Sequence, residues 1–270
     1  MSHTVLAIDV GNIRAKFGLF EIQDRSDSTK LPNFGLTTAQ SSANPINWSS
    51  VISELKLETR QDLRAVMAGS NPVAMQGIVD SWPASLGPVP WQLQSRADFP
   101  FEIKVDFPDK VGTDRLLNAT AVNRLKSKNS TALVIDTGTA TTVDLVCTDG
   151  AFLGGAILPG FELCARALHR YTTTLPLLDV HDLFDRIPDA VGKNTHDAVC
   201  SGLYWGHVGA VNQLLTSMSA TCPGEVEVYV TGGASPLLEP HLPSQTQVIP
   251  HLGLRGLVAL YETVTSGQSS

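Results

Sequence analysis

The sequence predicts a duplicated α/β fold in which each half of the chain starts with the same β-hairpin. In the N-terminal run AIDVGNIRAKFGLF, an apolar strand ends in Asp9, turns at Gly11 and continues as a second strand. The run VIDTGTATTVDLV repeats this pattern with Asp136 and Gly138. Strand-like and helix-like segments alternate after each hairpin, which is typical of α/β proteins. We therefore expect two domains that divide near Ala119.

In the first half, the pattern of apolar residues predicts each element in turn. Alternation predicts strands, and spacings of three and four residues predict helices. The expected strands occupy residues 4–10, 15–22 and 63–70, followed by an extended stretch at 101–114. The expected helices occupy residues 48–58, part of 71–87 and 115–127. Asp114 would be the N-cap of the last helix, and residues 24–33 would form a polar connection.

The second half begins again with a hairpin and ends with a helix. Its expected elements are a hairpin at 132–148, a strand and helix at 151–172, a long helix at 197–218, a strand at 225–233 and a closing helix at 252–264. No stretch rich in Gly or Pro separates the halves. The expected domains, residues 1–118 and 119–270, therefore adjoin without a flexible linker.

Composition limits the classes of function. Of the 270 residues, 43% are hydrophobic and 17% are charged, so the chain can bury a core without disulfides. A net charge of −7 argues against nucleic acid as a partner, because phosphate backbones are bound by clustered Lys and Arg. No apolar run is long enough to span a membrane. The four cysteines lack metal-ligand spacing and no secretory signal is visible, so we expect a cytoplasmic protein with reduced thiols.

The two hairpins can be superimposed residue by residue. Ile8 corresponds to Ile135, Asp9 to Asp136, Gly11 to Gly138 and Asn12 to Thr139. A glycine in each turn can take positive φ and leave backbone N–H groups open to an oxyanion. Side chains beside the glycines add neutral donors, namely those of Asn12, Thr139, Thr141 and Thr142.

A carboxylate at the end of each strand would repel phosphate unless a cation lay between them. Asp9 and Asp136 therefore imply bound metal ions. The alternative is that Asp and Gly only form the turn, and for a single hairpin we would favour it. Two matched copies, one at the start of each half, favour phosphate binding.

The segment PDKVGTDRL holds a third candidate group. Phosphoryl transfer to an alcohol needs a carboxylate near the hydroxyl proton and a cation to balance the developing charge. Asp114 and Arg115 offer both. The alternative is that Asp114 is only a helix cap, which stabilises the helix by about 1 kcal/mol. Sequence position does not separate these roles.

Over nearly its whole length, the chain resembles the type III pantothenate kinases. The motifs DVGNIRAK, VGTDR, IDTGTATTVD, GGAILPG, VGKNT and TGG occur in that family's order and at compatible spacing. The resemblance implies the fold of the actin, sugar-kinase and heat-shock ATPase superfamily. In this fold, two duplicated actin-like (ribonuclease H-like) domains enclose a nucleotide cleft.

The resemblance also implies a role for individual residues. The first phosphate loop of the ATP site would comprise Asp9, Val10, Gly11, Asn12, Ile13, Arg14, Ala15 and Lys16, with Thr139 as an ATP contact in the second. The contacts to pantothenate would be Gly112, Thr113, Asp114, Arg115 and Thr195. Asp114 would be the catalytic proton acceptor, and Asp136 would bind the monovalent cation.

The implied reaction is ATP-dependent phosphorylation of pantothenate to 4′-phosphopantothenate, the first step of coenzyme A biosynthesis. The family uses a divalent ion such as Mg²⁺ and also K⁺ or NH₄⁺, and it acts as a homodimer with pantothenate bound at the subunit interface. Three residues depart from the family's usual pattern. Ile13 replaces Thr or Ser, Val105 replaces a Tyr near pantothenate, and Thr113 replaces Ala.

Two other functions are compatible with the same fold. One is a kinase of another small alcohol such as a sugar, since fold does not fix function. The other is a regulatory module that binds a nucleotide without catalysis. Ile13 slightly favours the module, whereas Asp114, Arg115 and the two hairpin aspartates oppose it.

Overall fold

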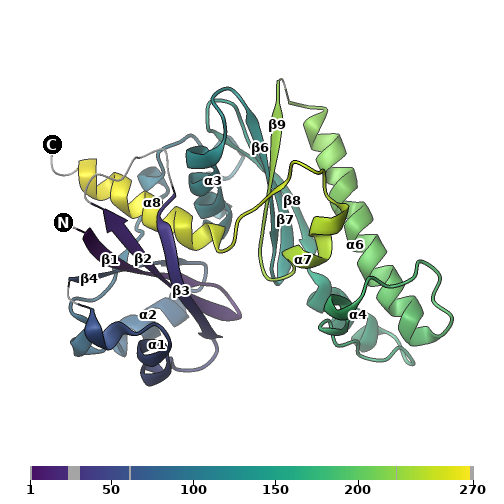
Figure 1. Ribbon diagram of the computed structural model, residues 1–270, viewed down its shortest axis with the longest axis horizontal. Coiled ribbons are helices and arrows are strands. Elements are labelled where there is room, and N and C mark those ends of the chain that lie inside the picture. Colours follow the sequence, from purple (N-terminus) through teal and green to yellow (C-terminus); the bar gives the residue numbers. More distant parts are fainter. Residues whose placement is uncertain (1, 24–30, 61, 223, 268–270) are drawn as a thin grey trace. The chain divides into compact units, whose positions relative to one another are not determined.

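The structure is a computed structural model that describes residues 2–23, 31–60, 62–222 and 224–267. The chain divides into two compact units. The first unit comprises Met1–Leu125 with His251–Ser270, and the second comprises Lys126–Pro250. Each unit contains a five-stranded sheet (Figure 1). Most of the polar connection expected at 24–33 lies outside the described residues.

The sheet of the first unit starts with the predicted hairpin. Its strands are β1 (Ser2–Val10), β2 (Arg14–Gln23), β3 (Asn33–Ser41), β4 (Leu63–Gly69) and β5 (Trp91–Gln92), in the spatial order β3-β2-β1-β4-β5. Strands β1 to β3 are antiparallel neighbours, whereas β4 runs parallel to β1 and β5 runs parallel to β4. The pairing of β1 with β2 confirms the first hairpin.

The sheet of the second unit has the same topology. Its strands are β6 (Thr131–Thr137), β7 (Ala140–Val146), β8 (Phe152–Pro159), β9 (Val226–Thr231) and β10 (Gln247–Val248), in the spatial order β10-β9-β6-β7-β8. Three antiparallel strands are again followed by two parallel ones. The duplication predicted from the paired hairpins is therefore confirmed in the strand order.

Helices cover both faces of the first sheet (Figure 1). Helices α1 (Trp48–Glu54) and α2 (Pro72–Asp80) cover one face, where Phe17, Leu55, Met67 and Ile78 are almost completely buried. On the other face lie α3 (Thr113–Leu125) and α8 (Leu252–Gly267). The unit also contains four short 3₁₀ turns within the described residues, at Leu57–Thr59, Ala84–Leu86, Arg96–Asp98 and Pro108–Lys110.

The boundaries of the two units differ from those expected from the sequence. The expected division at 118/119 falls inside α3, which is one continuous helix. The closing helix α8 belongs to the first unit because it packs along α3 and β1. Helices α3 and α8 are also joined by the salt bridge from Arg124 to Glu262, whose N–O distance is 2.8 Å.

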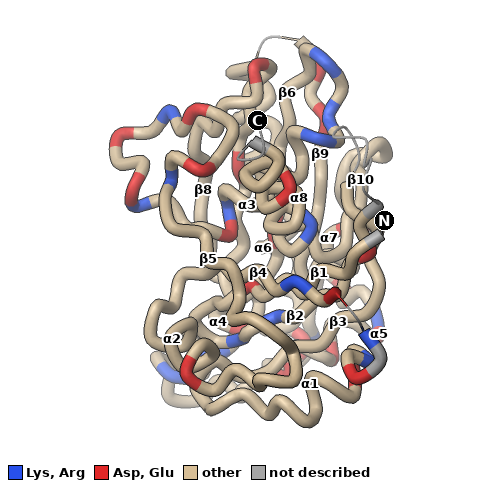
Figure 2. Tube along the Cα trace, turned by 90° about the vertical axis from the view of Figure 1, so that its left-hand side faces the viewer, with Lys and Arg blue, Asp and Glu red and all other residues tan. Residues whose placement is uncertain are grey.

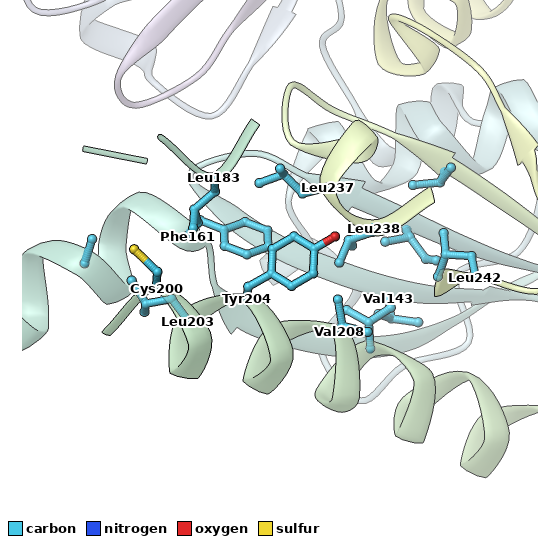
Figure 3. Close-up of a cluster of buried hydrophobic side chains, with 14 of the residues drawn as sticks. Val143, Phe161, Leu183, Cys200, Leu203, Tyr204, Val208, Leu237, Leu238 and Leu242 are labelled. Atoms are coloured by element: carbon cyan, nitrogen blue, oxygen red, sulfur yellow. The ribbon is translucent and has the colours of Figure 1, made fainter. Parts of the chain in front are cut away.

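The helices of the second unit pack on one face of its sheet. They are α4 (Phe161–Tyr171), α5 (Asp182–Asp185), α6 (Thr195–Ser219) and α7 (Ser235–Leu238), followed by a 3₁₀ turn at Glu239–His241. Figure 3 shows Tyr204 among side chains from α4, α6 and α7, and Tyr204 is 1% exposed. This core fixes the positions of α4 and α6 relative to the second hairpin.

Charged residues of both signs are interspersed along the described chain (Figure 2). Within the described ranges, no helix is both long enough and apolar enough to cross a membrane. All four cysteines are free thiols.

Candidate active site

The turn between β1 and β2 holds the first group of predicted nucleotide contacts. Asp9 is buried at the end of β1, and its carboxylate lies 3.9 Å from the ammonium group of Lys16 on β2. Asn12 and Ile13 form the exposed tip of the turn. The turn therefore combines a buried carboxylate, a neighbouring cation and an exposed polar tip.

Not every residue of the predicted first loop can offer its side chain to a ligand. The side chains of Val10 and Ala15 are fully buried in the core of the first unit. Any contact from these two residues to a nucleotide would come from the backbone. Arg14 is exposed, as are Asn12 and Ile13, so these three side chains are accessible.

The turn glycines do not adopt the expected conformation. Neither Gly11 nor Gly138 has a positive φ. The Gly11 N–H donates to the carbonyl oxygen of Arg14 at 3.0 Å, and the Gly138 N–H donates to that of Ala140 at 2.9 Å. These two glycine N–H groups close the turns and are not offered to an oxyanion, and contact from the other N–H groups of the turns stays a prediction.

The second turn is held against the start of α4. The N–H of Gly160 donates to the carbonyl oxygen of Thr139 at 3.0 Å. A Cβ at position 160 would lie 2.4 Å from the carbonyl oxygen of Gly138, so only glycine fits there without a shift of the backbone. Thr139 itself is exposed at the tip of the turn. The GGAILPG motif thus ends in a residue that supports the predicted nucleotide contact.

One of the threonines expected to bind phosphate has another partner. Thr141 is fully buried, and its hydroxyl lies 2.9 Å from Nε2 of His207 on α6. The His207 ring also packs on Phe161 at the start of α4, with ring centroids 4.2 Å apart. Burial lowers the pKa of His207, which favours the neutral ring. Sequence reasoning missed this histidine, because no motif surrounds it.

Asp136, the predicted ligand of the monovalent cation, lies near the end of β6 beside a buried hydroxyl group. It lies directly opposite Thr142 in the β6–β7 ladder, so the two side chains share one face of the sheet. The hydroxyl of Thr142 is buried and has no hydrogen-bond partner. Among the described residues, no group of three or more His, Cys, Asp or Glu side chains could hold a metal ion. This arrangement fits a hard cation bound mainly by neutral oxygens.

The predicted contacts to pantothenate lie at the start of α3. This helix begins at Thr113, so Asp114 lies inside its first turn and the expected N-cap position was wrong. The exposed Asp114 carboxylate accepts a hydrogen bond from the N–H of Arg115 at 2.9 Å. A Cβ at Gly112 would lie 2.5 Å from the same carboxylate oxygen. The Gly112–Asp114 spacing therefore provides room for this carboxylate.

Thr195 is the exposed first residue of α6, in the second unit. The preceding residue, Asn194, caps this helix by accepting a hydrogen bond from the N–H of Asp197 at 2.9 Å. A cavity of about 300 Å³ lies beside this end of α6 and is lined in part by Lys193 and His196. The VGKNT motif thus forms a helix start beside a polar cavity.

The structure groups the predicted residues within each unit. The first unit contains the Asp9–Lys16 turn and the Gly112–Arg115 segment. The second contains Asp136 and Thr139 at one hairpin, and Thr195 at the start of α6.

Comparisons with known proteins agree with the motifs. The family model described as type III pantothenate kinase matches residues 5–217. The type III pantothenate kinase of Gluconobacter oxydans is 32% identical over 262 residues, which cover 97% of this chain and 94% of that protein. The type III pantothenate kinase of Moorella thermoacetica is 31% identical over 261 residues, covering 97% of this chain and 100% of that protein.

Solved structures resemble this chain in fold. The activator of 2-hydroxyisocaproyl-CoA dehydratase from Clostridium difficile, solved with bound ADPNP, has a TM-score of 0.51 and 13% identity, covering 100% of this chain and 97% of that one. The ethanolamine utilization protein EutJ from Carboxydothermus hydrogenoformans has a TM-score of 0.51 and 14% identity, covering 96% and 89%. These likenesses agree with the duplicated α/β fold predicted from the repeat and with the actin-like fold that the family resemblance implies.

Proposed function

The chain belongs to the type III pantothenate kinases, and from this membership we propose how its own residues carry out the reaction. The enzyme transfers the γ-phosphoryl group of ATP to the primary hydroxyl of pantothenate. The product is 4′-phosphopantothenate, formed in the first step of coenzyme A biosynthesis. The residue roles below are our proposal.

Asp114 is the general base. Its carboxylate is exposed at the start of α3, where it can accept the proton of the attacking hydroxyl. Arg115 follows it directly and supplies a fixed positive charge near the transferred group. Gly112 and Thr113 are the proposed contacts to pantothenate beside Asp114 in the first unit. Thr195, in the second unit, keeps its proposed role as a substrate contact. The exposed Asp114 carboxylate in the first turn of α3 is the observation that carries this proposal.

Each hairpin turn, taken by itself, offers groups that can contact phosphate oxygens of ATP. In the first turn, Asn12, Arg14 and Lys16 have exposed side chains that can donate to phosphate oxygens. In the second, Thr139 offers its hydroxyl at the exposed tip. Ile13 is 51% exposed and supplies no donor, so backbone groups and the neighbouring side chains hold the nucleotide there.

Two kinds of cation complete the site. Asp136 and the buried hydroxyl of Thr142 hold K⁺ or NH₄⁺, and Asp9 lies where it can orient a divalent ion such as Mg²⁺. When bound, these cations neutralise the phosphate charge that the two carboxylates would otherwise repel. The chain's own contribution is to present both carboxylates at the ends of buried strands.

Replacing Asp136 by alanine is expected to remove the dependence of the rate on potassium. The wild-type enzyme should turn over faster in K⁺ than in Na⁺ at equal ionic strength, and Asp136→Ala should show nearly equal rates because the carboxylate ligand is lost. Steady-state ADP release in the two salts measures this ratio. Glu225→Ala, at an exposed acid just before β9, is the matched control and should retain the K⁺ preference. A wild-type rate that is the same in both salts would refute the cation assignment.

A homodimer is the proposed assembly, with pantothenate bound at the subunit interface. The second unit exposes several large apolar side chains that we propose for such a contact: Ile157, Tyr171, Leu177, Ile187 and Val191. We place the enzyme in the cytoplasm, where its four free cysteines would stay reduced.

Product analysis tests the proposed function directly. Purified protein with ATP, Mg²⁺, K⁺ and pantothenate should yield 4′-phosphopantothenate, detected by mass spectrometry. A panel of sugars and other small alcohols in the same assay tests the alternative of another kinase, which Val105 leaves open. Binding of ATP with no phosphorylated product from any acceptor would instead support a regulatory module.

A further inference from the structure

Arg96 forms side-chain hydrogen bonds with the two residues that flank Gly112. Its Nη1 donates to the hydroxyl of Thr113 at 2.9 Å, and its Nη2 donates to the carbonyl oxygen of Val111 at 2.6 Å. Val111 and Thr113 are 7% and 6% exposed, so both acceptors lie in largely buried residues. One guanidinium group thus fixes the two residues that flank Gly112, immediately before Asp114.

Arg96 is itself held rigidly. It starts the 3₁₀ turn Arg96–Asp98, which is closed by a capping box. The N–H of Ser95 donates to the Asp98 carboxylate at 3.0 Å, and the N–H of Ala97 donates to the Ser95 hydroxyl at 3.1 Å. Phe99, directly after the turn, is 5% exposed and anchors it in the interior of the first unit. The guanidinium therefore extends from a turn whose backbone is held by hydrogen bonds.

The two hydrogen bonds, one to Val111 and one to Thr113, require the forked side chain of an arginine. A guanidinium is a planar fork that can donate to two acceptors at once, whereas an ammonium group is a single point charge on a flexible stem. The bonds to Val111 and Thr113 use two separate nitrogens of the fork. Two backbone hydrogen bonds also hold this segment: the Val111 N–H donates to the carbonyl oxygen of Pro108 at 3.2 Å, and the Leu116 N–H donates to that of Gly112 at 3.4 Å.

The position of the Asp114 carboxylate depends on this backbone. Its Oδ1 lies only 2.5 Å from where a Cβ on Gly112 would be, so the carboxylate lies close against the Gly112 backbone. We propose that Arg96 is a positioning residue for Asp114, which holds the carboxylate where it meets the hydroxyl of pantothenate. This inference rests on the proposed role of Asp114 as general base.

Arg96→Met and Arg96→Lys test the inference. Arg96→Met should lower kcat/KM for pantothenate by about 10- to 100-fold, since a misplaced catalytic group costs on that order. The KM for ATP should change little, because Arg96 donates to Val111 and Thr113, neither of which is a proposed ATP contact. Arg96→Lys should recover only part of the loss. Added methylguanidinium should partly restore Arg96→Met, which a general loss of stability would not allow.

Arg124→Met is the matched control. Arg124 lies on the same helix as Asp114 and also donates to a carboxylate and a backbone carbonyl, those of Glu262 and Ala259. If Arg96 acted only through the stability of α3, Arg124→Met would give the same kinetic loss. Equal kinetics for the two variants, or wild-type kinetics for Arg96→Met, would overturn the inference. Failure of the wild-type enzyme to phosphorylate pantothenate would refute the proposed function instead.

Discussion

Asp114→Asn is expected to lower kcat by about 10²- to 10⁴-fold, the usual contribution of a positioned general base. This corresponds to about 3–5 kcal/mol of transition-state stabilisation. Asparagine keeps the oxygen that accepts the hydrogen bond from the Arg115 N–H, so the start of α3 should remain intact. Steady-state kinetics should therefore show the loss in kcat, with the KM for ATP nearly unchanged.

Asp109→Asn provides the control for this substitution. Asp109 is an exposed acid in the 3₁₀ turn Pro108–Lys110, five residues before Asp114, and it has no proposed role in the reaction. Its amide variant should have wild-type turnover. If Asp114→Asn were equally active, Asp114 would be only a first-turn acid, which stabilises a helix by about 0.3–1 kcal/mol through the helix dipole.

The repeat could be predicted because its signals are local. An apolar strand, an aspartate and a tight turn occupy about fifteen residues in each hairpin, and the pattern fixes which side chains face the core. Strand β3 was missed because it is a largely exposed strand at the edge of the sheet, with no clear apolar alternation. The helix at 252–264 was predicted, but its place in the first unit depends on packing against α3, which no local pattern encodes.

The candidate site also has parts that the sequence could predict and parts that it could not. Asp9, Asp136 and Asp114 could be named as candidates from the sequence because the repeat and the motifs mark them. The hydrogen-bond partners of the two turn glycines could not be predicted. In each hairpin the glycine N–H donates to a carbonyl oxygen of the same turn. The pairs Thr141–His207 and Arg96–Thr113 join residues far apart in the sequence, and only the folded chain brings them together.

Gly256→Ala is expected to destabilise the first unit strongly. Alanine normally stabilises a helix by about 1 kcal/mol relative to glycine. At position 256 in α8, however, a Cβ would lie 1.9 Å from the carbonyl oxygen of Leu117 on α3. The two helices would have to move apart, and such overpacking costs about 1–3 kcal/mol or more. Urea unfolding should therefore show a lower midpoint, and turnover should fall because α3 carries Asp114.

Gly206→Ala separates this steric effect from helix propensity. Gly206 lies in α6 of the second unit, where a Cβ would meet no atom within 4 Å, so alanine there should gain up to about 1 kcal/mol. The same substitution in two helices is thus expected to change stability in opposite directions. A midpoint for Gly256→Ala at or above that of the wild type would mean that α8 does not pack against α3 at this distance. The return of the C-terminal helix to the first unit would then need another explanation.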